Sequence, residues 1–415
     1  MSRPYGISRA EAARIAFRAS FDLALECAAY GKACGNVAVD PKGGREATLA
    51  ASALNSLGYV QIDTISVVER AHHHVLWSRT GGYRPEYLDI LQSEPRKAFE
   101  YWAHAAAYLP LGDYRYCLPR MRRIAQQGHE WFPHDKDIVA AVLERIRAEG
   151  PLRSQDFESH GPRGPWWDWK PAKAALEFLF HSGELMVRSR PGFQKLYDLR
   201  ERVLPPETDT RYPDDEEMAD HYICRGIHSL GVFTLRDLAY MRKDGTGSIK
   251  AALERAIERE ELIALRVEGS TMAWWADPRL LGGEAGAAMA CRPVRFLSPF
   301  DNMIIDRARA LRIFGLDYTL ECYVPKEKRR FGYFSLPVFR GETPIGLIDC
   351  KAERAASVLR VQRCRLFDED IGPDAASGMP DAILLRSPEG FREEFMAELT
   401  AFASFNGCDT VSFSS

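Results

Sequence analysis

The chain has 415 residues, 46% of them hydrophobic and 27% charged, with a net charge of −3, a composition typical of a globular protein with two to four domains. No apolar run approaches the roughly 18 residues of a membrane helix, and residues 1–21 lack the apolar block of a secretory signal, so we expect a cytoplasmic protein without a membrane partner. Nine scattered cysteines without a C-x-x-C pair argue against a structural zinc site and a disulfide scaffold.

Charge is unevenly distributed along the chain. Residues 295–365 contain 14 Lys and Arg against 8 Asp and Glu, whereas residues 366–415 contain 2 against 10. A basic segment therefore precedes an acidic tail. Such a segment suits a phosphate backbone, although a solvated face of an enzyme has the same composition.

The first expected domain, residues 1–130, is a less regular, winged-helix-like unit with two predicted helices and one unusual strand. Its first helix begins at a capping box of Ser8 and Glu11, and a loop over 31–44 precedes the second. In the following "YVQIDTI" (59–65), alternation places Gln61 and Asp63 on one face and apolar residues on the other. Three interpretations are open: Gln61 and Asp63 are catalytic, they form the solvent-exposed face of a half-buried strand, or Asp63 caps a following turn.

Two similar segments follow, at 131–205 and 206–290. Each has a helix, a break with Gly and Ser or Thr, two further helices and an apolar hairpin, which is the plan of a winged helix. The last domain, residues 291–415, changes to short predicted strands over 318–324, 331–339, 344–351 and 358–367. We therefore expect an α+β protein with tandem winged helices and a C-terminal β-rich domain.

Cations gather between the first two of these predicted strands, in "PKEKRR". They are Lys326, Lys328, Arg329 and Arg330. A basic hairpin tip suits a row of phosphates, but it is also a common charged turn that protects a strand pair from aggregation.

Four stretches in order resemble the winged-helix DNA glycosylases of the YcaQ/AlkX type, related to AlkZ. The resemblance covers about residues 5–410 and is strongest in "LGYVQIDTISVVERAHHHVLWSRTGGY", "EYWAHAAAYLP", "WWDWKPAKAALEFLFHSGELMV" and "LSPFDNMIIDRARALRIFGLDYTLECYVPKEKRRFGYFSLPV". The family's motif of Gln, an aliphatic residue and Asp corresponds to Gln61, Ile62 and Asp63. A sister branch carries Gln in the third place, so Asp63 indicates the branch with the broader substrate range.

The resemblance implies a monofunctional glycosylase arranged around a concave DNA-binding face, and we expect a monomer. Its implied reaction hydrolyses the N-glycosidic bond of N-alkylated purines of the N7-alkylguanine type and unhooks interstrand crosslinks in double-stranded DNA, with no cofactor. Asp63 and Gln61 would be catalytic. One departure from the family is Ala105, where the form "EYWAH" is normally followed by Glu.

Other side chains have competing interpretations. We expect DNA contacts from Arg79, His72 and His74, and packing from the tryptophan cluster at 166–169. A metal site at the three consecutive histidines is disfavoured, because neighbouring residues do not converge on one ion. The alternative function is a non-catalytic winged-helix regulator, for which Asp63 would have no use.

Overall fold

The computed structural model describes residues 4–21, 44–93, 95–128, 135–157, 171–240, 246–281, 293–367 and 389–414. Of the expected loop over 31–44, only Gly44 is among the described residues. The tryptophan cluster at 166–169 lies wholly outside them. None of the described helices is long and apolar enough to span a membrane.

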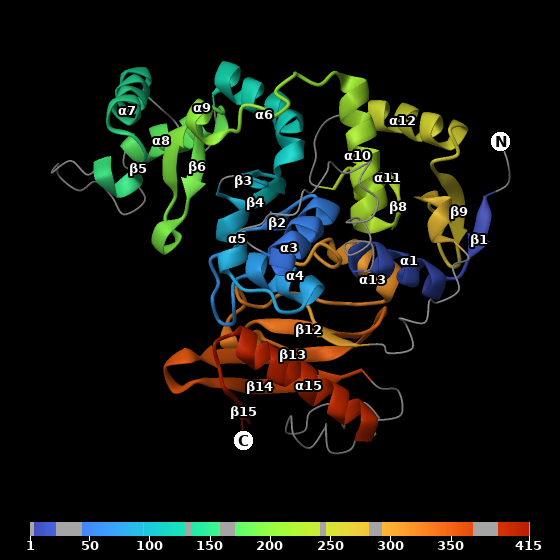
Figure 1. Ribbon diagram of the computed structural model, residues 1–415. Helices are drawn as coiled ribbons and strands as arrows, with labels where there is room; N and C mark the ends of the chain where they lie inside the picture. Colours follow the sequence, from blue (N-terminus) through green and yellow to red (C-terminus); the bar gives the residue numbers. More distant parts are fainter. Residues whose placement is uncertain are drawn as a thin grey trace.

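A central unit holds the Gln-x-Asp motif. Its helices are α3 (Gly44–Leu57), α4 (Ala71–Thr80) and α5 (Glu86–Leu91), and its antiparallel sheet has the order β2 (Val60–Gln61), β4 (Ala106–Pro110), β3 (Ala98–Trp102). Buried alanines on α3 allow the neighbouring helices to pack closely against it. Figure 1 shows this unit between the two repeats and beside the C-terminal sheet.

The two repeats have the expected order of elements, except that among the described residues the second expected helix of the first repeat is a 3-10 turn. The first has α7 (Lys136–Glu149), β5 (Leu152–Arg153), a 3-10 turn (Ser154–Phe157), α8 (Pro171–His181), β6 (Leu185–Ser189), β7 (Leu196–Leu199) and α9 (Arg200–Val203). The second has α10 (Asp215–Leu230), β8 (Val232–Phe233), α11 (Leu235–Leu238), α12 (Thr246–Glu258), β9 (Ile263–Val267) and β10 (Trp274–Ala276). In each, the short first strand pairs with the second strand of the hairpin.

The C-terminal unit is a five-stranded sheet covered by one long helix. Its strands run in chain order: β11 (Val294–Phe296), β12 (Ser335–Arg340), β13 (Thr343–Glu353), β14 (Val358–Leu366) and β15 (Thr410–Phe413). α15 (Glu389–Phe405) buries Phe395, Leu399 and Phe402 against this sheet. α13 (Arg307–Phe314) belongs to a different core, in which Phe314 packs edge-on against Phe339.

One predicted strand is wrong. Residues 318–324 form a loop, and after β11 the chain returns to the sheet only at Ser335. The carboxylate of Glu321 accepts backbone N–H groups from Arg330, Phe331 and Gly332, at 2.9, 2.8 and 3.3 Å. These donors therefore bind a side chain and are not used in a strand ladder.

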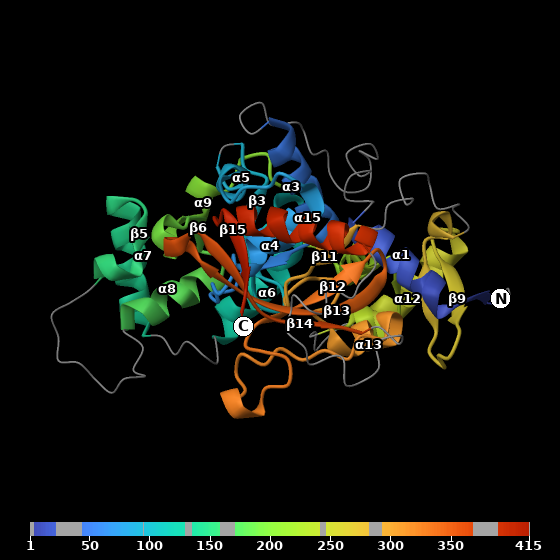
Figure 2. The ribbon, with the colours of Figure 1, turned by 90° about the horizontal axis from the view of Figure 1, so that it is seen from below.

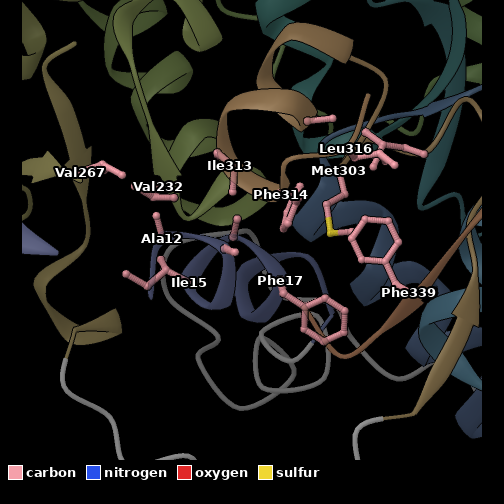
Figure 3. Close-up of a cluster of buried hydrophobic side chains, with 14 of the residues drawn as sticks. Ala12, Ile15, Phe17, Val232, Val267, Met303, Ile313, Phe314, Leu316 and Phe339 are labelled. Carbon is pink, nitrogen blue, oxygen red and sulfur yellow. The ribbon is translucent and has the colours of Figure 1, made fainter. Parts of the chain in front are cut away.

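The boundary expected at residue 130 does not match the packing. β1 (Tyr5–Ile7) pairs in parallel with β9, and α1 (Arg9–Phe21) shares a core with the second repeat and the C-terminal unit. Figure 3 shows Ile15 and Phe17 of α1 in this cluster with Val232, Phe314 and other residues. At the other end, α6 (Tyr114–Gln127) packs with α7 and α8 of the first repeat. Residues 1–130 therefore do not form a separate domain, because the apolar faces of their first and last helices are buried against other units.

Candidate active site on the strand at residues 59–65

The motif begins as an edge strand and ends as a turn. Gln61 pairs with Ala107 of β4, and the N–H of Ile62 donates to the carbonyl of Ala106 at 2.8 Å. The strand was expected to continue to residue 65, but the Asp63 Oδ2 atom accepts the N–H of Ile65 at 2.8 Å. A short acidic side chain that bonds the backbone two residues ahead replaces the strand by an Asx turn.

The alternation of side chains agrees with the sequence prediction. Val60 is fully buried against α3 and α4, and Ile62 packs partly against the same cluster. Gln61 and Asp63 are half-buried and remain accessible. Packing on one side thus holds the strand while the polar pair reaches solvent on the other.

Burial determines the electrostatics of Asp63. Loss of water raises the pKa of its carboxyl above the ordinary value of 3.8, while hydrogen bonds from the backbone of Ile65 and Thr64 and the charge of Arg70 oppose the rise. Within the described chain, Asp63 forms no ion pair with any Lys or Arg. A half-buried carboxylate that forms no ion pair can interact with a cation supplied by a ligand.

Gln61 has a partner that the sequence did not reveal. His104 lies in the turn between β3 and β4, and its Nε2 is 3.0 Å from the Gln61 Oε1. The next residue, Ala105, is half-buried in the same turn, so the position that departs from the family pattern adjoins the motif. The only signal in the sequence was the presence of this histidine within "EYWAHAAAYLP".

The basic segment is an exposed loop that begins beside Asp63. Lys326, Lys328 and Arg330 are exposed, and Figure 2 shows the orange loop with the short helix Lys326–Lys328 projecting from the body. Arg329 is half-buried, with its guanidinium 4.9 Å from the Tyr333 ring centroid and its Nε donating to Val324. The loop therefore presents several charges to solvent, as the sequence predicted.

Two residues connect the loop to the motif electrostatically. Burial raises the pKa of the Cys322 thiol, and the Asp63 carboxylate raises it further. Asp63 also contributes to the raised pKa of Tyr323, after Cys322 and burial. The Tyr323 side chain is 86% exposed, which is unusual for a large ring and was not predicted.

Arg79 was wrongly predicted to contact DNA. Its side chain has no exposed surface and forms a bidentate pair with Asp301, with Nη1–Oδ2 at 2.7 Å and Nη2–Oδ1 at 2.9 Å. It also donates to the backbone and hydroxyl of Ser20 at the end of α1. Arg79 thus joins three segments inside the core.

The structure also corrects the prediction for His72 and His74. Both lie on helix α4 and are 1% exposed. The His72 ring stacks parallel to Phe193, and the His74 Nε2 is 2.8 Å from the carbonyl oxygen of Phe296. Burial holds the pKa of His72 well below 6.5 and that of His74 at about 4. Both are packing residues in the neutral form.

The fold and the site define a mixed α+β protein in which an edge strand presents a glutamine and an unpaired aspartate beside a basic loop. Residues 54–405 match the family model described as DNA glycosylase AlkZ-like. The chain belongs to the AlkZ-like DNA glycosylase family. Among solved structures, Streptomyces sahachiroi DNA glycosylase AlkZ has a similar fold, with a TM-score of 0.55 and 15% identity over 98% of this chain and 100% of that chain.

Proposed function

We propose that this protein is a monofunctional DNA glycosylase that hydrolyses the N-glycosidic bond of N-alkylated purines, of the N7-alkylguanine type, and unhooks interstrand crosslinks. One observation carries the proposal: the half-buried carboxylate of Asp63 has no ion-pair partner in the described chain and lies near the start of the exposed basic loop. Its charge raises the pKa values of Cys322 and Tyr323, which immediately precede the cations of that loop. Family membership supplies the reaction class.

The chemistry of an alkylated base explains why one carboxylate suffices. A purine alkylated on a ring nitrogen is cationic, so it accepts the electron pair of the breaking C1′–N bond without a general acid. The deoxyribose becomes oxocarbenium-like, and the ionised Asp63 stabilises that charge. Water then adds to C1′, and its proton passes to Asp63 acting as general base. Gln61 orients the reacting groups from the same strand face.

DNA would be held mainly through its backbone. Lys326, Lys328 and Arg330 are exposed cations suited to phosphates, and the exposed ring of Tyr323 is suited to stacking on a base or sugar near the reacting nucleotide. We propose that the two repeats act as winged helices and complete a concave DNA-binding face. A base tied to the opposite strand cannot leave the stack freely, and an edge strand brought to the duplex avoids the need for a deep pocket.

The test is release of N7-methylguanine from duplex DNA under single-turnover conditions, with an interstrand-crosslinked duplex assayed in parallel. The wild type should release the base and unhook the crosslink, and Asp63→Asn should bind the same DNA with similar affinity but react roughly 10²–10⁴-fold more slowly. A non-catalytic regulator would release no base and would bind DNA equally well or more tightly after this substitution. Equal product from both proteins would reject the role of Asp63.

A further inference from the structure

The side chain of Gln61 is held by a histidine from another strand pair. We propose that His104 is a positioning residue that fixes the Gln61 amide and turns its NH₂ group toward the reacting atoms. This inference rests on the proposed function and adds a residue to it. The hydrogen bond between His104 Nε2 and Gln61 Oε1, at 3.0 Å, is the observation that carries it.

The backbone brings the two side chains together. β4 lies between β2 and β3, so the turn that connects β3 to β4 ends beside β2, the strand that contains Gln61. Within this turn, the N–H of Ala103 donates to the carbonyl of Ala105 at 2.9 Å, which makes the turn tight at His104. The imidazole is therefore presented from a sheet that already includes Gln61.

The ring of His104 is also held by aromatic contacts. Tyr59 meets it edge to face at 5.2 Å between centroids, and Tyr240 packs at 5.8 Å with a tilt of 58°. Tyr59 is itself anchored, because Asn302 Nδ2 donates to its carbonyl at 3.0 Å. Two aromatic side chains thus restrict the imidazole, and a hydrogen-bond donor held in this way can hold its acceptor in place.

The protonation state of His104 determines which residue donates in the hydrogen bond with Gln61. Burial lowers the pKa of His104, so the imidazole is neutral at physiological pH and has one N–H. A carboxamide oxygen only accepts, so the proton is on Nε2 when that atom bonds Oε1. The oxygen of Gln61 then faces His104 and the amide NH₂ faces away from it. Gln61 would consequently act on the substrate or the water as a hydrogen-bond donor.

Two substitutions separate this role from simple packing. His104→Phe keeps an aromatic ring between Tyr59 and Tyr240 but loses the donor, whereas His104→Gln loses the ring and keeps an N–H donor of similar reach. A positioning role predicts that His104→Phe slows single-turnover release of N7-methylguanine by about 30- to 100-fold at unchanged DNA affinity. It also predicts that His104→Gln retains most of the rate. A packing role predicts the opposite order.

A double-mutant cycle tests whether His104 acts through Gln61. In a Gln61→Ala background, His104→Phe should cause no further loss of rate. The control is His228→Phe, which makes the same substitution at a half-buried histidine on α10 whose Nδ1 is 2.7 Å from a carbonyl of its own helix, and it should react like the wild type. Thermal melting of each variant identifies any that fails to fold. If His104→Phe is such a variant, His104→Gln replaces it in the comparison with Gln61→Ala.

The outcomes are distinguishable from failure of the proposed function. If the wild type releases no alkylated base, both the function and this inference are rejected. If the wild type is active and Asp63→Asn is not, an unchanged rate in His104→Phe rejects the role of His104 alone. Equal losses from His104→Phe with and without Gln61 reject it as well.

Discussion

The environment of Asp63 differs from that of an ordinary surface carboxylate in a way that favours base catalysis. Burial raises its pKa above 3.8, and the backbone of Ile65 and Thr64 only partly offsets this effect. An aspartate with a raised pKa is a stronger base once ionised, which suits proton transfer from water. Because the ionised form is the reactive one, activity should be lost as pH falls through the raised pKa.

The pH dependence of base release follows from the raised pKa of Asp63. We expect the single-turnover rate to rise with pH along an acidic limb whose midpoint lies above 3.8, and to level off when Asp63 is ionised. Gln61→Ala should lower the plateau and leave the midpoint in place. Asp63→Asn should remove the limb together with most of the rate. An unchanged limb in Asp63→Asn would assign the titration to another group.

Arg79 and Asp301 provide a stability prediction at the same scale. Their ion pair has no exposed side-chain surface, so Arg79→Met leaves an unpaired buried carboxylate. We expect a loss of about 3–5 kcal/mol in the free energy of unfolding, measured by urea denaturation. The double variant Arg79→Met/Asp301→Leu should lose less. A stable Arg79→Met with weakened DNA binding would instead restore the interpretation drawn from the sequence.

These residues show what sequence patterns can and cannot reveal. Strand alternation predicted the accessible faces of Gln61 and Asp63, because a period of two is local information. The burial of Arg79 depends on Asp301, which lies 222 positions away, and no local pattern indicates that contact. His104 was missed for the same reason, since its partner is 43 positions distant.

At the scale of elements, the basic loop is a separate device for binding. Exposed Lys326, Lys328 and Arg330 should each release condensed counterions on meeting DNA. Replacing all three by Ala should weaken duplex binding and reduce the slope of log K against log salt by about 0.9 for each phosphate that the variant no longer neutralises. Fluorescence anisotropy over a salt series measures both quantities.

A matched control comes from the same unit. Lys351 on β13 is exposed, with its ammonium 3.9 Å from Glu353, and Lys351→Ala should leave the salt slope unchanged. If the loop variant keeps the wild-type slope, its cations do not contact DNA, and the segment is then a charged turn. The chemical step at saturating protein should be little affected, because these cations are not placed at the reacting bond.

The hairpins and most helices of the repeats were predicted well because their signals are local, whereas the helix expected from Ser154 is a 3-10 turn over the described residues. The capping box of Thr234 and Asp237 and the glycine after α10 appear directly in the sequence and in the structure. The strand expected at 318–324 failed because alternation alone does not show where backbone donors are used. Glu321 binds three of them nine to eleven residues further along the chain.

At the scale of the whole molecule, buried charges hold the units together. Arg190, next to the hairpin turn of the first repeat, binds both carboxylate oxygens of Glu100 on β3 at 2.7 Å. The Arg190 side chain is 11% exposed and that of Glu100 has no exposed surface. This pair connects the first repeat to the sheet that carries the Gln-x-Asp motif.

We expect Arg190→Met to lower the free energy of unfolding by up to about 3–5 kcal/mol, because it leaves the buried Glu100 carboxylate with only the Lys195 ammonium, 3.9 Å away, as a cationic partner. Amide hydrogen exchange should increase in β6 and β7, where the repeat loses its anchor. Arg147→Met on α7 is a suitable control, since the Arg147 side chain is 50% exposed and that of its partner Glu144 is 69% exposed. A loss below about 1 kcal/mol for Arg190→Met would show that the units are held by apolar packing alone.

The pairing of β1 with β9 has a consequence for biosynthesis. Tyr5–Ile7 leave the ribosome long before their partner strand, Ile263–Val267, which lies about 250 residues further along the chain. Until then the nascent chain carries an unsatisfied strand edge and the exposed apolar side chains of the adjoining helix. Completion of this architecture is therefore a late event, and chaperone contact during translation should be concentrated on the amino-terminal segment.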